Sequence, residues 1–255
     1  MNILVCIKRV PDVGSKFYLT EDGQAIDTTN LGFTISPHEE CAVEEAISII
    51  EKTGGHATVL TLGPAEAEEQ LKDSLARGMT DAILLESDQP EWDPRQTAQA
   101  IIEAVKSEEA KNEPFDLIMF GSESADSGNA QIGIRVAHGL DRPIICGLKN
   151  LTVTDSKIIG KRDIPNGMEV YETTLPAVVT IKEGINLPRY PSFRGRIKAK
   201  KKEIFRLSPD QISRQMEMIQ LQHPDEQKKE VEMLGEGISA APEVVNIFKQ
   251  LKLLK

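Results

Sequence analysis

Short apolar runs recur along the first half of the chain, and helical patterns separate most of them. The runs are Ile3–Ile7, Ala57–Leu62, Ala82–Leu85 and Leu117–Phe120. Helical patterns occupy Glu39–Lys52, Pro64–Arg77, Pro94–Lys106 and roughly Ala130–Leu140. Strands that alternate with crossover helices form a parallel sheet with both faces covered. The pattern predicts an α/β fold with a doubly wound, Rossmann-like, mostly parallel sheet.

The pattern changes after Cys146. Polar and apolar residues alternate around Leu151–Ile159 and Met168–Thr173, and the tract Asp163–Gly167 between them is typical of a hairpin turn. We therefore expect an antiparallel hairpin that leads into the apolar run Ala177–Ile181.

The carboxyl-terminal part of the chain is polar. Residues from Ser208 to Pro242 are rich in Gln, Glu and Lys, and only Glu243–Leu254 regains a helical apolar pattern. We expect one domain, residues 1–207, followed by an arm, residues 208–255, whose helix packs on a partner subunit.

Charge is distributed unevenly. The net charge is −10, yet the segment from Gly184 to Lys202 holds seven Lys or Arg and no acid after Gly184. A single basic island on an acidic chain argues against nucleic-acid binding, which needs a broad basic face. An acidic protein surface is the partner that this segment predicts, although a solvated strand face is the commoner role of a short lysine run.

The remaining composition predicts a protein of a reducing compartment, and we expect a cytoplasmic location. Cys6, Cys41 and Cys146 are widely spaced and form no CxxC, so neither a disulfide framework nor a metal site is expected. The first residues show no basic leader, and no apolar run is long enough for a membrane span. Direct membrane insertion is therefore not expected.

The segment Phe120–Gly133 runs from an apolar strand through small polar residues into a helix. Backbone N–H groups and the helix dipole favour an anion at such a junction. A nucleotide phosphate is one interpretation, and an ordinary capped loop is the other. The segment matches neither GxGxxG nor a P-loop.

Four tracts together resemble the electron transfer flavoprotein beta subunit. They are Val5–Asp12; Ile35–Ala46, which resembles the family's NP…AVEEA helix entry; Phe120–Gly133; and Pro188–Lys202, which contains PRY followed by IKAKKK. The resemblance extends from Asn2 to about Phe205. It implies an adenine-nucleotide-binding type of sheet.

The resemblance also implies cofactor sites. An AMP would be held by Cys6, Ser36, Leu62, Gly63, Gly121, Asp126, Ser127, Gly128, Asn129, Ala130, Gln131 and Ile132, and Val13 and His38 would lie near the edge of an FAD shared with the alpha subunit. His38 beside Pro37 has a second interpretation, a solvated helix-entry residue.

Some positions depart from the family's sequence pattern. Ser36 and Ala130 stand where Asn is usual, and Ile132 stands where Thr is usual. AMP remains the first choice. Electron-bifurcating members, which bind a second FAD in the beta subunit and react with NADH, are the alternative.

For the basic segment the resemblance implies docking onto flavoprotein dehydrogenases. Phe193 would be the apolar anchor in place of the family's Leu, and Arg194, Arg196 and Lys198 would steer association, with Tyr190 beside them. The alternatives are that Arg189 and Tyr190 pin the loop to the domain and that Phe193 folds into the core. The adjacent acids Glu44 and Glu45 are expected on a solvated helix face.

The implied function is an electron carrier rather than an enzyme. As beta subunit of a heterodimer, it would accept electrons from dehydrogenases such as the acyl-CoA type of fatty acid oxidation and pass them through FAD towards a quinone reductase. No Ser/His/Asp or Cys/His set is visible, which disfavours hydrolysis. A small nucleotide-binding protein resembling universal stress proteins would also explain the sheet, but not the basic segment or the arm.

Overall fold

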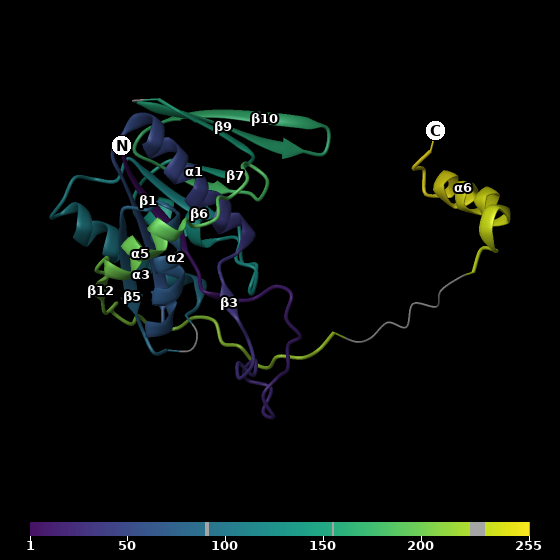
Figure 1. Cartoon of the computed structure of the whole chain (residues 1–255), viewed down its shortest axis with the longest axis horizontal. Helices are drawn as coiled ribbons and strands as arrows, with labels where there is room; N and C mark the ends of the chain where they lie inside the picture. The colour runs from purple at the N-terminus through teal and green to yellow at the C-terminus, as the bar shows by residue number, and fades with distance from the viewer. Residues whose placement is uncertain (90–91, 155, 225–232, 255) are drawn as a thin grey trace. The chain divides into compact units, whose positions relative to one another are not determined.

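A parallel sheet forms the core of the first part of the chain in the computed structural model, which describes residues 1–89, 92–154, 156–224 and 233–254 (Figure 1). Its seven strands have the order β12-β5-β4-β1-β6-β11-β7, and every neighbouring pair is parallel. The strands are β1 (Asn2–Ile7), β4 (His56–Gly63), β5 (Asp81–Glu86), β6 (Leu117–Gly121), β7 (Ile144–Leu148), β11 (Ala177–Ile181) and β12 (Phe205–Leu207).

Helices cover both faces of this sheet. They are α1 (Pro37–Thr53), α2 (Glu68–Arg77), α3 (Pro94–Glu109), α4 (Ile132–Gly139) and α5 (Phe193–Lys201), with a short 3₁₀ turn η1 (Ala65–Ala67) before α2. One core cluster joins α1, α2 and α5 to one face, and a second joins α3 and α4 to the other. The doubly wound, Rossmann-like prediction is therefore confirmed.

The alternation of side chains in β1 shows why the sheet is buried on both faces. Ile3 and Val5 belong to the first core cluster, and Leu4 and Cys6 belong to the second. Successive residues of a strand point to opposite faces, so a continuous apolar run suits a strand that has helices on both sides.

Two smaller sheets complete the first part of the chain. Strands β8 (Asn150–Val153), β9 (Lys157–Ile164) and β10 (Gly167–Thr174) form an antiparallel sheet in the order β10-β9-β8, and β2 (Val10–Pro11) pairs with β3 (Phe33–Thr34). The predicted hairpin is present. The tract Leu151–Ile159, expected as one strand, is divided because Thr154 turns the chain by hydrogen bonds with Lys157.

The chain divides into two compact units, Met1–Ile219 and Gln220–Lys255. Residues 208–219 belong to the first, since Gln96 Nε2 donates to the Ile212 carbonyl at 2.8 Å and the Gln215 N–H donates to Asp93 Oδ2 at 2.8 Å. The second unit contains η2 (Gly237–Ala240) and α6 (Ala241–Gln250). No helix in the described ranges is both long and apolar enough to cross a membrane.

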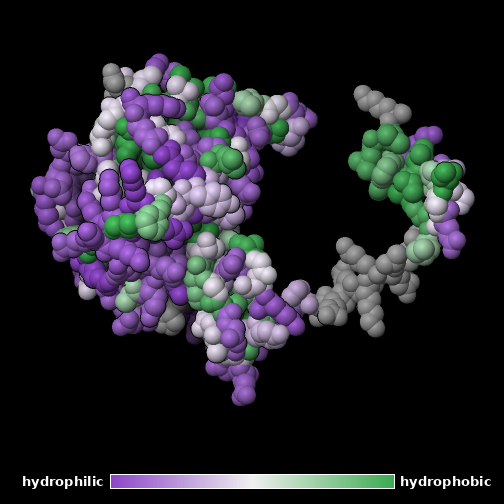
Figure 2. All heavy atoms as spheres, in the orientation of Figure 1, coloured by the Kyte–Doolittle hydropathy of each residue, from purple (hydrophilic) through white to green (hydrophobic). Residues whose placement is uncertain are grey.

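Helix α6 carries a row of exposed apolar side chains. Val244, Phe248 and Leu251, which directly follows the helix, are spaced by three or four residues, and they are 36%, 43% and 62% exposed. Figure 2 shows hydrophobic side chains gathered on this helix. An amphipathic helix without a buried residue is typical of a helix that packs on another protein.

Candidate functional site

The carboxyl ends of β1 and β6 meet at the point where the strand order reverses. From β1 the chain builds β4 and β5 on one side, and it then returns to place β6 on the other side. In open α/β sheets a ligand binds outside the strand ends at this switch point. Lys8 follows β1 here, and the loop from Ser122 to Gln131 follows β6.

This loop presents unused backbone donors. Among the described residues, no N–H group from Asn129 to Ile134 donates to another part of the chain. Gly128 and Ala130 both have left-handed backbones, with φ of 57° and 53°. When left-handed residues alternate with other conformations, successive backbone N–H groups point inwards to one place. The dipole at the start of α4 favours an anion there as well. The arrangement suits a phosphate or another anion.

An ion pair joins the end of β1 to this loop. Lys8 Nζ lies 2.5 Å from Asp126 Oδ2 and 3.4 Å from Ser127 Oγ. Burial opposes ionisation of Asp126, but Lys8 and hydrogen bonds from Ser124 and Ser127 outweigh it and lower the pKa of this carboxyl. Asp126 is thus an anchor for the loop.

Ser36 connects the loop to helix α1. The Ser36 side chain is fully buried, and its Oγ accepts a hydrogen bond from the Ala125 N–H at 2.9 Å. Its own N–H donates to Glu39 Oε2 at 3.0 Å, which caps the helix. Ser36 therefore lies below the loop and shapes it.

Glu39 is a buried carboxyl at the base of the site. It is 5% exposed, and burial raises its pKa to about 8 despite hydrogen bonds from the Ser36 and Lys8 backbones. Helix α1 comes so close to β6 here that a Cβ on Gly121 would lie 2.8 Å from Glu39 Cγ. Gly121 thus permits the contact between the two elements.

His38 bridges three segments at the same edge. Its Nδ1 accepts a hydrogen bond from the Glu183 N–H at 2.7 Å, and its Nε2 lies 3.8 Å from Glu123 Oε1. Because Nδ1 is an acceptor, the neutral ring carries its proton on Nε2 and directs it towards Glu123. His38 is thus more than a solvated helix-entry residue.

The other residues expected to bind a cofactor make fewer contacts with the loop 122–131. Cys6 is buried in the core. Burial and, to a smaller extent, Glu39 raise the pKa of its thiol, so the side chain is uncharged. Leu62 and Gly63 end β4 next to β1. Val13 lies after β2 with 61% of its side chain exposed, and nothing among the described contacts joins it to His38.

Lys8, Glu39 and Glu123 contribute to this site although no role was expected for them from the sequence. The only sequence signal for Lys8 is its position as the first charge after an apolar strand. Glu39 and Glu123 gain their roles from elements that are distant along the chain.

The basic segment forms a second candidate site. Its first half is a loop, and its second half is α5, where Ser192 Oγ caps the helix by accepting from the Gly195 N–H at 3.0 Å. Tyr190 is 95% exposed and Phe193 is 80% exposed, which excludes a core position for Phe193.

Most cations of α5 make no ion pair with the described residues. Within the described part of the chain, no ion pair involves Arg194, Arg196, Lys198, Lys200 or Lys201. Arg189 instead binds Glu44, which is only 8% exposed, so the expectation of a solvated face is wrong for Glu44. The alternative that Arg189 pins the loop is correct, whereas Tyr190 projects into solvent.

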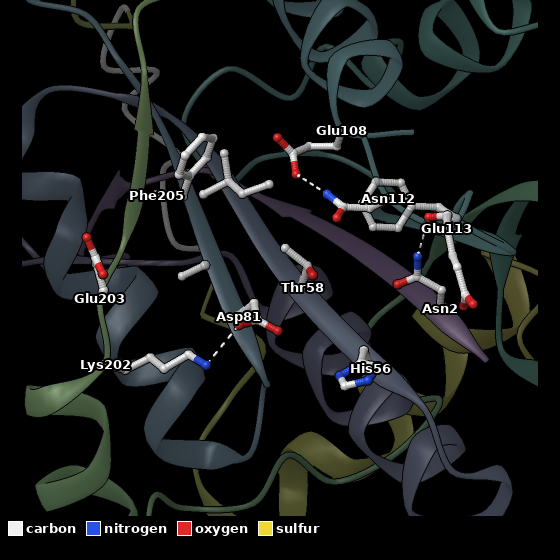
Figure 3. Close-up of a pocket in the computed structure, with 13 residues that line it drawn as sticks. Asn2, His56, Thr58, Asp81, Glu108, Asn112, Glu113, Lys202, Glu203 and Phe205 are labelled. Atoms are coloured by element: carbon white, nitrogen blue, oxygen red, sulfur yellow. Dashed lines mark hydrogen bonds and ion pairs between the residues drawn. The ribbon is translucent and has the colours of Figure 1, made fainter. Parts of the chain in front are cut away.

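Two pockets lie away from the switch point. One, of about 820 Å³, opens at the amino ends of the strands, where Lys202 pairs with Asp81 at 2.8 Å and Asn112 donates to Glu108 (Figure 3). Its drawn polar groups pair largely with one another. The other, also about 820 Å³, lies between α2 and α5. Neither is lined by a residue of the loop 122–131.

Comparison with known proteins gives a consistent result. Residues 25–212 match the model of the family described as "Electron transfer flavoprotein domain". A protein of Bacillus subtilis (strain 168) named "Electron transfer flavoprotein subunit beta" is 37% identical over 214 residues, which cover 83% of this chain and 80% of that protein.

Two further relatives carry the same name. The protein from Thermoanaerobacterium thermosaccharolyticum is 34% identical, with 83% of this chain and 80% of the relative covered. The protein from Megasphaera elsdenii is 31% identical, with 80% of this chain and 77% of the relative covered.

Proposed function

The chain belongs to the electron transfer flavoprotein family as a beta subunit, and from that premise we propose a specific role in electron transfer. In this proposal it forms a heterodimer with an alpha subunit, takes electrons from flavoprotein dehydrogenases and passes them towards a quinone reductase. The protein's task is to position the cofactor and to recognise partners, since the redox chemistry belongs to the flavin.

The first part of the proposal is that the loop 122–131 binds the phosphate of AMP. The observation that carries it is the row of unpaired N–H groups from Asn129 to Ile134 at the switch point, among the described residues. Asp126 fixes the loop through Lys8, and Ser36 supports it from below. The departures at Ala130 and Ile132 remove family side chains, while main-chain donors are retained.

The second part concerns the flavin. FAD, shared with the alpha subunit, would supply the electron-transfer chemistry. From this chain, His38 would present its Nε2–H to the flavin, because the Glu183 N–H occupies Nδ1 and Glu123 Oε1, 3.8 Å from Nε2, is beyond hydrogen-bond distance. Val13 would lie at the open side of the same edge.

The third part assigns α5 and the preceding loop to the dehydrogenase. Phe193 is the apolar anchor, with Tyr190 beside it, and Arg194, Arg196 and Lys198 steer an acidic partner. Aromatic anchors carry much of the binding energy of small interfaces, and rim charges mainly accelerate association.

Counting the nucleotides of the purified heterodimer tests the proposal. Equal amounts of AMP, FAD and heterodimer are expected after denaturation and chromatography. Two FAD and no AMP, together with oxidation of NADH, would instead establish the electron-bifurcating alternative, for which the small residue Ala130 before Gln131 is the supporting observation. A heterodimer without AMP or FAD would contradict both.

A further inference from the structure

Residues 184–192, here the docking loop, are attached to helix α1 by an extensive set of hydrogen bonds. Arg189 Nε donates to both carboxylate oxygens of Glu44, at 3.1 and 2.9 Å, and Nη2 donates to Oε1 at 2.9 Å. The Arg189 N–H also donates to Glu44 Oε2 at 3.0 Å. Glu51 Oε1 accepts a hydrogen bond from Arg189 Nη1 at 2.6 Å, and Glu51 Oε2 accepts one from Arg189 Nη2 at 3.0 Å.

Asn186 adds a second attachment to the same helix. Its Nδ2 donates to the Cys41 carbonyl at 3.0 Å and to Glu45 Oε2 at 2.9 Å. Residues 41, 44, 45 and 51 are spaced so that they share one side of α1. Two loop residues are thus fixed along about three turns of one helix.

The far end of the docking loop is fixed by packing. Helix α5 lies against α2 so closely that a Cβ on Gly195 would lie 2.1 Å from the Ala76 carbonyl oxygen. Ser192 Oγ caps the same helix. Both ends of the loop are therefore held by different elements of the domain.

The docking loop and the first residue of α5 carry large, highly exposed apolar side chains. Leu187 is 91% exposed, Tyr190 is 95% exposed and Phe193 is 80% exposed. They recur every three residues, while Asn186 and Arg189, which directly precede Leu187 and Tyr190, bind α1. Beside them stand the cations of α5 that make no ion pair with the described residues.

So many hydrogen bonds are unusual for an exposed segment, because surface loops generally remain mobile. A half-exposed bidentate Arg–carboxylate pair gains more than a simple surface pair, since geometry and hydrogen bonds are both satisfied. A loop that is already ordered in the folded protein does not have to be ordered when a partner binds. The entropic cost of association is therefore smaller.

We propose that Glu44 and Arg189 are positioning residues that hold Leu187, Tyr190 and Phe193 as one preformed apolar surface for a protein partner whose apolar cleft has an acidic rim. This inference rests on the proposed docking function and adds Leu187 to the contact surface. The cations of α5 provide the charge complementarity, and the clamp formed by Glu44 and Arg189 provides the rigidity.

Glu44→Gln separates rigidity from charge. The substitution leaves every apolar residue and every cation in place and makes the docking side more positive. If charge alone governed docking, an acidic dehydrogenase would associate at least as fast. A preformed surface predicts the reverse, with binding about tenfold weaker because several side chains must be ordered on association.

The matched control is Glu40→Gln. Glu40 lies on the same helix, carries the same charge and pairs with Arg77 of α2 at 2.7 Å instead of with a residue of the docking loop. Two readouts are needed on the intact heterodimer: hydrogen exchange of the amides from Asn186 to Ser192, and the Kd and association rate with an acyl-CoA dehydrogenase, measured at two salt concentrations.

The expected result for Glu44→Gln is faster exchange in the docking loop together with weaker binding, with Glu40→Gln like the wild type in both. Unchanged exchange would overturn the clamp. Faster exchange with unchanged binding would overturn its role in docking. If the wild type itself does not bind the dehydrogenase, the proposed docking function fails, while the exchange result still decides whether the clamp exists.

Discussion

Glu39 is a carboxyl group in an environment that disfavours its charge. It is 5% exposed, and only backbone N–H groups, the Ser36 side chain and the nearby Lys8 compensate for the loss of water. Its neighbours at the end of β1 and the start of α1, Lys8 and Ser36, contact the loop 122–131. The protonation state of this one residue therefore affects the stability of the candidate site.

Stability should depend on pH through Glu39. Its pKa rises from 4.5 to about 8 on folding, so the folded state binds a proton that the unfolded state lacks within this window. The contribution to stability is full below 4.5 and is lost as the pH rises to about 8. The slope from this group is at most about 1.4 kcal/mol per pH unit.

Glu39→Gln should remove this dependence. Urea unfolding at a series of pH values should show the variant gaining stability relative to the wild type as the pH rises. Glu40→Gln, on the same turn of α1, controls for the loss of one negative charge. Parallel pH profiles of wild type and Glu39→Gln would contradict the prediction.

Gly121→Ala should damage the site through contact alone. The new Cβ would lie 2.8 Å from Glu39 Cγ and 3.1 Å from the Glu39 backbone nitrogen, so α1 must shift away from β6. We expect a loss of about 1–3 kcal/mol in unfolding free energy, with less nucleotide retained after purification. Gly14→Ala, where a Cβ meets nothing within 4 Å, is the control and should retain both properties.

At the level of elements, long apolar patterns were predicted well and short edge strands were not. Strands β1, β4, β5 and β6 are longer than the expected apolar runs by only one or two residues each. Strand β12 has three residues, two of them exposed, so its own sequence carries no strand signal. It forms because α5 delivers it to the open edge of β5.

Helix η1–α2 shows a similar limit. One helix was expected over Pro64–Arg77, whereas the structure has a 3₁₀ turn to Ala67 followed by α2. The two conformations share the same residue preferences over one turn, so composition does not distinguish them.

Gly195→Ala should have two opposite effects on stability, one from helix propensity and one from packing. Within an isolated helix, the substitution would stabilise α5 by up to about 1 kcal/mol. The Ala76 carbonyl oxygen, 2.1 Å from the new Cβ, instead forces α5 away from α2. We expect a net loss of stability, weaker dehydrogenase binding and an unchanged nucleotide content. Calorimetry, binding and nucleotide analysis on one preparation would test this, and a more stable variant with normal binding would contradict it.

At the level of the whole molecule, the two units have different relations to partners. The first buries its apolar residues in two core clusters, whereas every residue of α6 is at least partly exposed. We propose that α6 is buried by the alpha subunit. This helix would then form the permanent contact, and the charged docking surface the transient one.

Phe248→Glu should prevent formation of the heterodimer. Phe248 lies in the apolar row of α6, and a carboxylate there would have to be buried without a partner. Co-expression with a tagged alpha subunit should recover little of the variant, while Gln250→Glu, a control in the same helix, should be recovered normally. Equal recovery of both variants would show that α6 lies outside the subunit contact.

The doubly wound sheet and the family could be predicted from the sequence, because these depend on local periodicity and on motifs that are contiguous in the chain. Which side chains cooperate depends on how distant elements pack. Lys8 meets Asp126, Ser36 meets Ala125 and Arg189 meets Glu44, each pair far apart along the chain. Side-chain spacing along one element gives no information about which distant element will pack against it, and burial, which sets the charge of Glu39, arises only from that packing.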